Sequence, residues 1–262
     1  MKKYHEDQIK ALLGIQDKNS VALIHKRFGG PIFNMEIEGG PPYILLDIVE
    51  DQTEFVDSTQ KGWEKGVEEN KDLVERFKQK IREKDAKVGE VFPLSPIPLL
   101  IHLGSLLTDT VPYPIYQFNR ETGYWVAEHP GFSPELTLTS TKDLKNKKEL
   151  AVLVSISGKV KCEYVDEVLE EPYDAISFEI NDPGVNRVVY RDDVRRIQVK
   201  VKEDIEQLLQ EHNYDKMHLF YDGPAGLAIE LGRGINSNMW PEVSLYDYKV
   251  RRTPKYQKAF SI

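Results

Sequence analysis

The chain has 262 residues, of which 40% are hydrophobic and 30% are charged, a balance that allows an ordinary globular core. Its formal net charge of −8 argues against a protein that coats long DNA or RNA, because such binding depends on neutralising many phosphates. It still permits a small anionic ligand in a locally basic pocket. The single cysteine, Cys162, excludes an internal disulfide and a multi-cysteine metal site, and we expect it to be a buried bystander in a strand.

No apolar run approaches the ~20 residues that a membrane-spanning helix needs. The N-terminus also leads into no signal-peptide core. We therefore expect a cytoplasmic protein with no membrane partner.

The first forty residues, 1–40, are predicted to be a preface that includes a short strand at 21–24. A first unit over 41–130 opens with an apolar, β-rich run at 43–49, which is typical of a central parallel strand. A long amphipathic helix is predicted next, at 58–85, because apolar residues recur there at intervals of three, four or seven. These apolar residues are Trp63, Val67, Val74, Phe77 and Ile81.

The rest of the first unit is predicted to be a strand near 91–94, a helix at 97–107 and a strand at 113–118. A polar connection, 131–148, then leads to a second unit over 149–262. The second unit repeats the same order of elements and carries extra strands within 175–190. Its predicted strands are 150–156, 175–180, 188–190, 217–220 and 243–248, and its predicted helices are 201–209 and 225–235.

Apolar strands that alternate with helices indicate an α/β protein with parallel sheets covered on both faces. A repeat supports a division into two pseudo-symmetric Rossmann-like halves, since six residues recur at one constant offset of 128. The residues Phe92, Pro96, Leu99, Ile101, Leu103 and Gly104 match Phe220, Pro224, Leu227, Ile229, Leu231 and Gly232. Each copy places a turn before a helix, and the N–H groups at a helix N-terminus bind anions and phosphates.

Ligands of open parallel sheets bind beyond the carboxyl ends of the strands. This rule selects turns in both halves, where glycines permit close approach of a ligand. The alternative that these residues only build turns stays open. The ligand-binding residues predicted at the turns are Ser95, Pro96, Ile97, Ser155, Ser157, Gly158, Asp222, Gly223, Pro224 and Ala225.

Basic and aromatic residues near the turns complete the predicted site. Lys159, Lys161 and Arg120 are expected to neutralise phosphates, and Trp125 is expected to stack on a base, as are Tyr116 and Tyr246. For each aromatic residue the competing interpretation is a place in the core.

Catalytic signatures are missing: the sequence contains no phosphate-binding P-loop, dinucleotide fingerprint, zinc-protease motif or nucleophile elbow. We therefore predict no catalytic residue, no metal and no cofactor. His102 is predicted to be a packed core histidine. Asp192 and Asp193, with the arginines beside them, are predicted to form a solvated loop cluster rather than a metal or acid pair.

Several segments, taken in order, resemble the SAVED family, sensors of cyclic oligonucleotides in bacterial anti-phage defence. The likeness runs from about residue 40 to the C-terminus. The segments are SPIPLLIHLG at 95–104, VPYPIYQFNRETGYW at 111–125, LVSISG at 153–158, HLFYDGPAGLAIELGR at 218–233 and VSLYD at 243–247.

The resemblance implies two fused CARF-like units whose shared cleft binds a cyclic tri- or tetranucleotide, in CBASS or type III CRISPR signalling. The family is usually fused to a nuclease, protease or TIR effector, which the forty leading residues are too few to hold. We therefore expect a non-catalytic receptor for a cyclic tri- or tetra-adenylate, with its output through oligomerisation or a partner effector.

Two other classes stay open. One is a ring nuclease that linearises its ligand, in which Lys159 or Ser157 acts on the phosphodiester. The other is a structural adaptor that binds no ligand.

Overall fold

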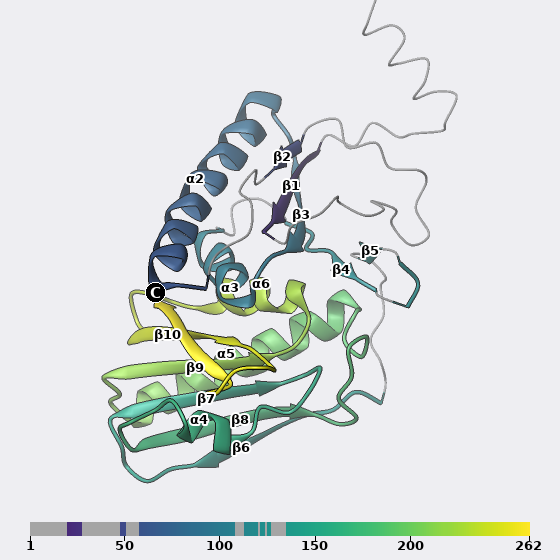
Figure 1. Cartoon of the computed structure of the whole chain (residues 1–262). Helices are drawn as coiled ribbons and strands as arrows, with labels where there is room; N and C mark the ends of the chain where they lie inside the picture. Colours follow the sequence, from purple (N-terminus) through teal and green to yellow (C-terminus); the bar gives the residue numbers. More distant parts are fainter. Residues whose placement is uncertain are drawn as a thin grey trace, which may run out of the picture.

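The computed structural model describes residues 20–27, 48–50, 58–107, 113–119, 121–123, 125–126 and 135–262. Two short helices, α3 (Ile97–Leu106) and α6 (Ala225–Gly234), lie between an upper and a lower sheet (Figure 1). The largest apolar core contains residues of both sheets and of both helices, so the two halves share one interior. None of the described helices has the length and apolarity that a bilayer crossing needs.

The first sheet is entirely parallel, in the order β2-β1-β3, and the inner residues of its β1 and β3 strands are buried. The strand predicted inside the preface is therefore the central strand of this sheet. Of the strand predicted at 43–49, residues 43–47 lie outside the described residues. The strands are β1 (Ser20–Lys26), β2 (Ile48–Glu50) and β3 (Val88–Leu94).

The strand predicted at 113–118 lies beside β3 but is irregular. The Tyr116 N–H donates to the Val91 carbonyl at 2.9 Å, and the Val91 N–H donates to the Pro114 carbonyl at 3.0 Å. Pro114 has no N–H to continue a ladder, which explains why regular pairing is so short. Only β4 (Gln117–Phe118) counts as a strand, and it pairs with β5 (Trp125–Val126).

The second sheet has six strands in the order β11-β10-β9-β7-β8-β6, and its four inner strands are parallel. Its antiparallel edge strand β6 falls in the predicted connection 131–148, so that prediction missed a strand. The prediction of a strand at 188–190 is wrong. These residues form an irregular segment that leads into a helix, and Val188 is buried in the core without belonging to a sheet. The strands are β6 (Leu138–Asp143), β7 (Glu149–Ser155), β8 (Tyr173–Ile180), β9 (Lys216–Asp222), β10 (Glu242–Tyr248) and β11 (Tyr256–Ser261).

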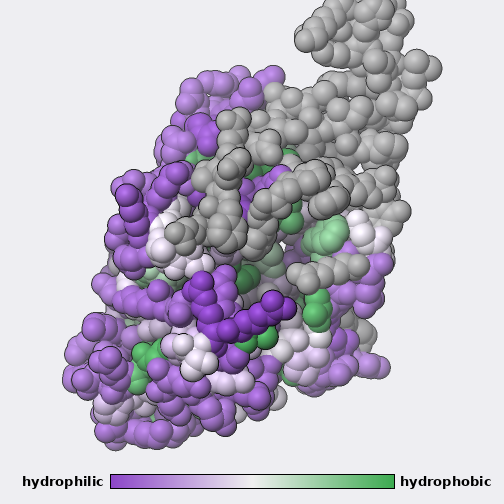
Figure 2. Space-filling model, in the orientation of Figure 1, coloured by the Kyte–Doolittle hydropathy of each residue, from purple (hydrophilic) through white to green (hydrophobic). Residues whose placement is uncertain are grey.

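Three further helices cover the sheets. The apolar face of α2 (Gln60–Lys84) is buried and its Lys/Glu face is solvated, as predicted, and Figure 2 shows that its visible surface is hydrophilic. Asp192 and Asp193 begin α5 (Arg191–Glu211) instead of lying in a loop, because acidic side chains suit the first turn of a helix. Cys162 is exposed at the start of α4 (Cys162–Asp166), so the prediction of a buried strand residue is wrong.

The structure repeats its elements at the offset found in the sequence. The bounds of β3 and β9 differ by 128 residues at both ends, and so do those of α3 and α6. The strand ends are also joined alike: the Arg27 N–H donates to the Leu94 carbonyl at 3.1 Å, and the Ile156 N–H donates to the Asp222 carbonyl at 2.7 Å. The prediction of two pseudo-symmetric α/β halves agrees with this arrangement.

Two glycines of the repeat allow α3 and α6 to cross in backbone contact. A Cβ added to Gly104 would overlap the carbonyl oxygen of Ile229, and a Cβ added to Gly232 would overlap that of Ile101. The repeat relates Gly104 to Gly232 and Ile101 to Ile229. The contact is therefore reciprocal, as a two-fold axis between the helices requires.

We expect Gly104→Ala and Gly232→Ala each to lower the free energy of unfolding by roughly 1–3 kcal/mol or more, because the helices must separate. Alanine is otherwise the better helix former by about 1 kcal/mol, so without the crossing the effect would have the opposite sign. Urea unfolding measures it. The matched control is Gly184→Ala, where the nearest neighbour of the new methyl is 4.0 Å away and stability should hardly change.

Buried polar side chains fix α3 against α2 and β1. Asn70 donates from Nδ2 to the Leu99 carbonyl at 2.8 Å, and the same atom lies 3.2 Å from Nδ1 of His102. The Asn70 Oδ1 lies 2.6 Å from Nε2 of His25. Burial, with smaller contributions from Lys71 and His25, lowers the pKa of His102 to about 4. His102 is thus a core histidine, as predicted.

The low pKa of His102 predicts a loss of stability in acid. Below about pH 6.5 the unfolded chain binds a proton at this ring, whereas the folded protein binds it only near pH 4. The free energy of unfolding should therefore fall by roughly 1–3 kcal/mol as the pH drops through this window. Denaturant titrations between pH 7 and pH 4 should show a shallower fall in His102→Gln, and an unchanged fall in the control His212→Gln.

Candidate functional site

The two predicted turns of the second half meet at Asp222. Its carbonyl oxygen accepts hydrogen bonds from the N–H groups of Ile156 and Ser157, at 2.7 and 3.0 Å. Its carboxylate packs against Gly158, where an added Cβ would lie 2.6 Å from Oδ2. Burial raises the pKa of Asp222. The structure therefore brings residues 155–158 and 222–223 together as one surface at the carboxyl edge of the sheet.

The side chains of the first turn have different tasks. Ser155 is buried, and its Oγ accepts a hydrogen bond from the Val160 N–H at 3.0 Å, so this hydroxyl shapes the turn. Lys159 and Lys161 are exposed, and the Lys159 ammonium lies 3.2 Å from the Glu179 carboxylate. The Lys161 ammonium lies 5.5 Å from the centre of the Tyr164 ring.

The second turn is held by one side chain from β9 and by another from the first half of the chain. The Tyr221 hydroxyl donates to the Pro224 carbonyl at 2.7 Å, and a Cβ on Gly223 would overlap that hydroxyl. The Gly226 N–H, in the first turn of α6, donates to Oε1 of Gln117 at 2.9 Å. A first-half side chain thus already occupies one of the N–H groups at the start of α6.

The predicted turn of the first half, Ser95 to Ile97, begins α3. Ser95 is buried and its hydroxyl donates to the His25 carbonyl at 3.0 Å. Pro96 occupies the N-cap position. Among the described residues, no hydrogen bond joins this turn to the turn at 222–225. The two turns are connected through the crossing of α3 and α6.

The aromatic residues predicted to contact the ligand do not join this surface. Arg120 lies outside the described residues. Trp125 is 1% exposed, and its ring packs edge-on against Phe92 with the ring centres 5.3 Å apart. The core interpretation is confirmed for Trp125, Tyr116 and Tyr246, all of which are buried. Because no face of the Trp125 ring is open, we do not retain its base-stacking role.

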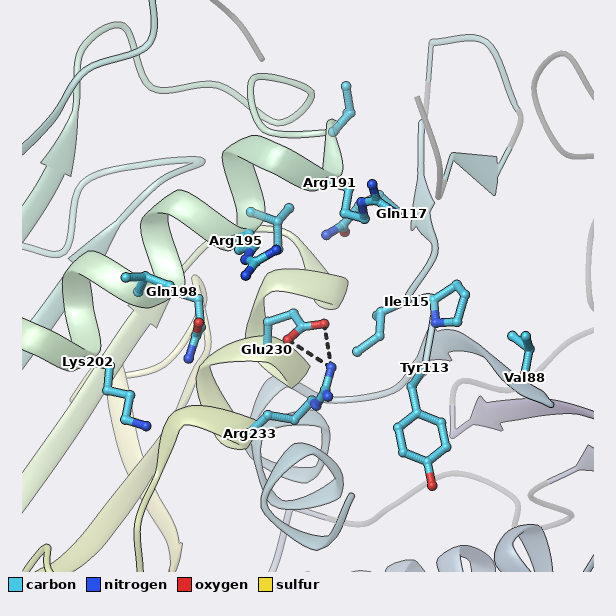
Figure 3. Close-up of a pocket in the computed structure, with 14 residues that line it drawn as sticks. Val88, Tyr113, Ile115, Gln117, Arg191, Arg195, Gln198, Lys202, Glu230 and Arg233 are labelled. Carbon is cyan, nitrogen blue, oxygen red and sulfur yellow. Dashed lines mark hydrogen bonds and ion pairs between the residues drawn. The ribbon is translucent and has the colours of Figure 1, made fainter. Parts of the chain in front are cut away.

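A cavity of about 690 Å³ lies between α5 and α6 on one side and Val88 and the segment 113–117 on the other (Figure 3). We call it the basic groove. Residues of α5 that follow one another at intervals of four, three and four place their side chains on one face of the helix. These residues are Arg191, Arg195, Gln198 and Lys202, and α6 adds Arg233 and Glu230.

The sequence prediction missed the basic groove, because Arg191 and Arg195 were interpreted as part of a loop. The signal that could have found them is their helical spacing with Lys202. None of the ligand-binding residues predicted at the turns lines this groove. In the part of the chain that the structure describes, no group of three His, Cys, Asp or Glu residues could hold a metal ion.

Two Rossmann-like units joined through paired helices define a class of domain that binds ligands at its strand ends. A family model described as the SMODS-associated and fused to various effectors sensor domain, SAVED, matches residues 70–262. The chain belongs to the SAVED family. No curated protein matches it.

Solved structures share the fold at low sequence identity. The Acinetobacter baumannii Cap4 SAVED/CARF-domain containing receptor with the cyclic trinucleotide 3'3'3'-cAAA gives a TM-score of 0.61 at 13% identity, over 92% of this chain and 52% of that chain. The same receptor with 2'3'3'-cAAA gives 0.63 at 13% identity, over 98% and 53%. The Moraxella osloensis Cap4 receptor gives 0.56 at 13% identity, over 98% and 51%. The chain thus spans about half the length of these proteins.

Proposed function

We propose that this protein is a receptor for a cyclic oligonucleotide of the tri- or tetra-adenylate type. The family model describes a sensor domain, and two of the similar structures contain a cyclic trinucleotide of adenylates. The observation that carries the proposal is the duplicated turn before α3 and α6, held in register by the reciprocal glycine contacts. A ring of repeated nucleotides presents repeated phosphates to such a pair of turns.

We place the ligand over the surface formed by 155–158 and 222–225, with the turn at 95–97 as the contribution of the first half. The exposed ammonium groups of Lys159 and Lys161 are the cations of this surface. A bound phosphate would compete with Glu179 for the Lys159 ammonium. A charge-assisted hydrogen bond of this kind would help the chain to hold an anion in spite of its net charge of −8.

We further propose that the signal leaves through a change of assembly or of partner, in cytoplasmic anti-phage defence. A ligand shifts an equilibrium only where it binds two states with different affinity. The solvated face of α2 and the edge strand β11 are surfaces that such a change could use.

A binding screen with cyclic di-, tri- and tetra-adenylates tests the proposal. We expect calorimetry to show binding of the tri- or tetra-adenylate, chromatography to recover the ligand intact, and light scattering to show a new mass or a pull-down to show a new partner. Recovery of linear product would identify a ring nuclease instead. If no cyclic oligonucleotide binds, the receptor proposal fails.

Variants of the turn locate the site. Gly158→Leu should weaken binding of the cyclic ligand at least tenfold, because the new side chain would displace the Asp222 carboxylate and cover the turn. Lys159→Ala and Lys161→Ala should each cost about 1.5–3 kcal/mol of binding free energy if they make charged hydrogen bonds. Lys216→Ala is the matched control, because Lys216 lies at the opposite end of the strands, where its ammonium is 3.7 Å from the Glu149 carboxylate. Unchanged affinity in Gly158→Leu would remove this turn from the site.

A further inference from the structure

The three cations that α5 contributes to the basic groove are weakly neutralised. The only carboxylate among its described lining residues is Glu230, and both of its oxygens accept from the Arg233 guanidinium, at 3.1 and 3.2 Å. Lys202 is 4.0 Å from Glu206 and Arg191 is 3.9 Å from Asp192, both long pairs on the helix surface. Arg195 forms no ion pair within the part of the chain that the structure describes. The groove therefore carries positive charge in an acidic protein.

The positive charge of the groove is spread along α5. From Arg191 to Lys202 the helix rises by about 16 Å, at 1.5 Å per residue. A single phosphate cannot contact both ends of such a row, whereas a ligand with several phosphates can. The planar guanidinium groups of Arg191 and Arg195 also suit phosphate oxygens, which they bind as a fork.

The wall opposite α5 has a different character. The alkyl groups of Val88, Pro114 and Ile115 line this wall. The Tyr113 ring is buried beside them, with the Arg233 guanidinium 5.9 Å from its centre (Figure 3). A volume of about 690 Å³ suits a small organic ligand. One cationic wall and one apolar wall match a molecule that has phosphates on one side and a heterocycle on the other.

Gln117 supplies a hydrogen-bond donor beside this cavity. It lines the groove, and its Oε1 already accepts from the Gly226 N–H. Its Nε2 is buried and has no hydrogen-bond partner among the residues that the structure describes. A buried amide donor is rarely left unsatisfied, so a ligand with an acceptor near Gln117 would complete it.

From these contacts we propose that the basic groove is a second binding site, which takes a linear nucleotide with two or more phosphates. The phosphates lie along Arg191, Arg195 and Lys202, and the base lies against Pro114 and Ile115. The site is separate from the turns at which we place the cyclic ligand, and it does not depend on that function.

Calorimetry on the full chain at low salt tests this site with ATP, 5'-phosphorylated linear triadenylate and tripolyphosphate as probes. We expect ATP or the triadenylate to bind more tightly than tripolyphosphate, and the tighter of the two identifies the class of nucleotide. Arg195→Gln should weaken this binding about tenfold or more, since a charged hydrogen bond is lost. Arg76→Gln on α2 removes the same charge elsewhere and should leave it unchanged.

Two results would overturn the proposal. One is that the Arg191→Gln/Arg195→Gln double variant binds the nucleotides with the same affinity as the parent. The other is that tripolyphosphate binds as tightly as both nucleotides. The cyclic triadenylate separates this site from the turns. It should neither compete with the linear probe nor lose affinity in Arg195→Gln, and if it does either, the groove is not a separate site. If no cyclic ligand binds while the linear probe does, the receptor proposal fails and the groove stands.

Discussion

The crossing of α3 and α6 is the contact on which the rest of the structure depends. Gly104 and Gly232 let two backbones touch where any larger residue would hold them apart, and the shared core forms around that contact. Close packing of this kind leaves little freedom to slide or tilt. The crossing therefore fixes the register between two separate sheets, and with it the position of every turn that follows a strand in either half.

The two candidate sites are supported in different ways. The turns at 155–158 and 222–225 are held mainly by backbone hydrogen bonds and by a carboxylate packed against glycine, so their shape depends little on flexible side chains. The basic groove instead depends on long charged side chains of α5. In an acidic protein such cations attract anions at short range only, because salt screens charges beyond about 10 Å.

Local patterns in the sequence predicted the parts of the fold that repeat or that have one buried face. The constant offset located α3, α6, β3 and β9, and the spacing of apolar residues located α2. The sequence could not place β1 at the centre of its sheet, since strand order depends on tertiary pairing. It also missed β6, whose polar, exposed residues resemble a linker. The basic groove was not predicted because its two walls, α5 and 113–117, are far apart in the chain and meet only after folding.

The starts of α3 and α6 are not chemically equal. The N–H of Gly226 is bound by Gln117, whereas the repeat places Pro98, which has no N–H, at the same position of α3. Two identical subunits must present identical groups on both sides of their axis. A duplicated chain is released from that constraint, and each copy can diverge. On the receptor proposal, a ring bound to this surface would therefore have one preferred rotation about the pseudo-two-fold axis, whereas an exactly two-fold site would make two rotations equivalent.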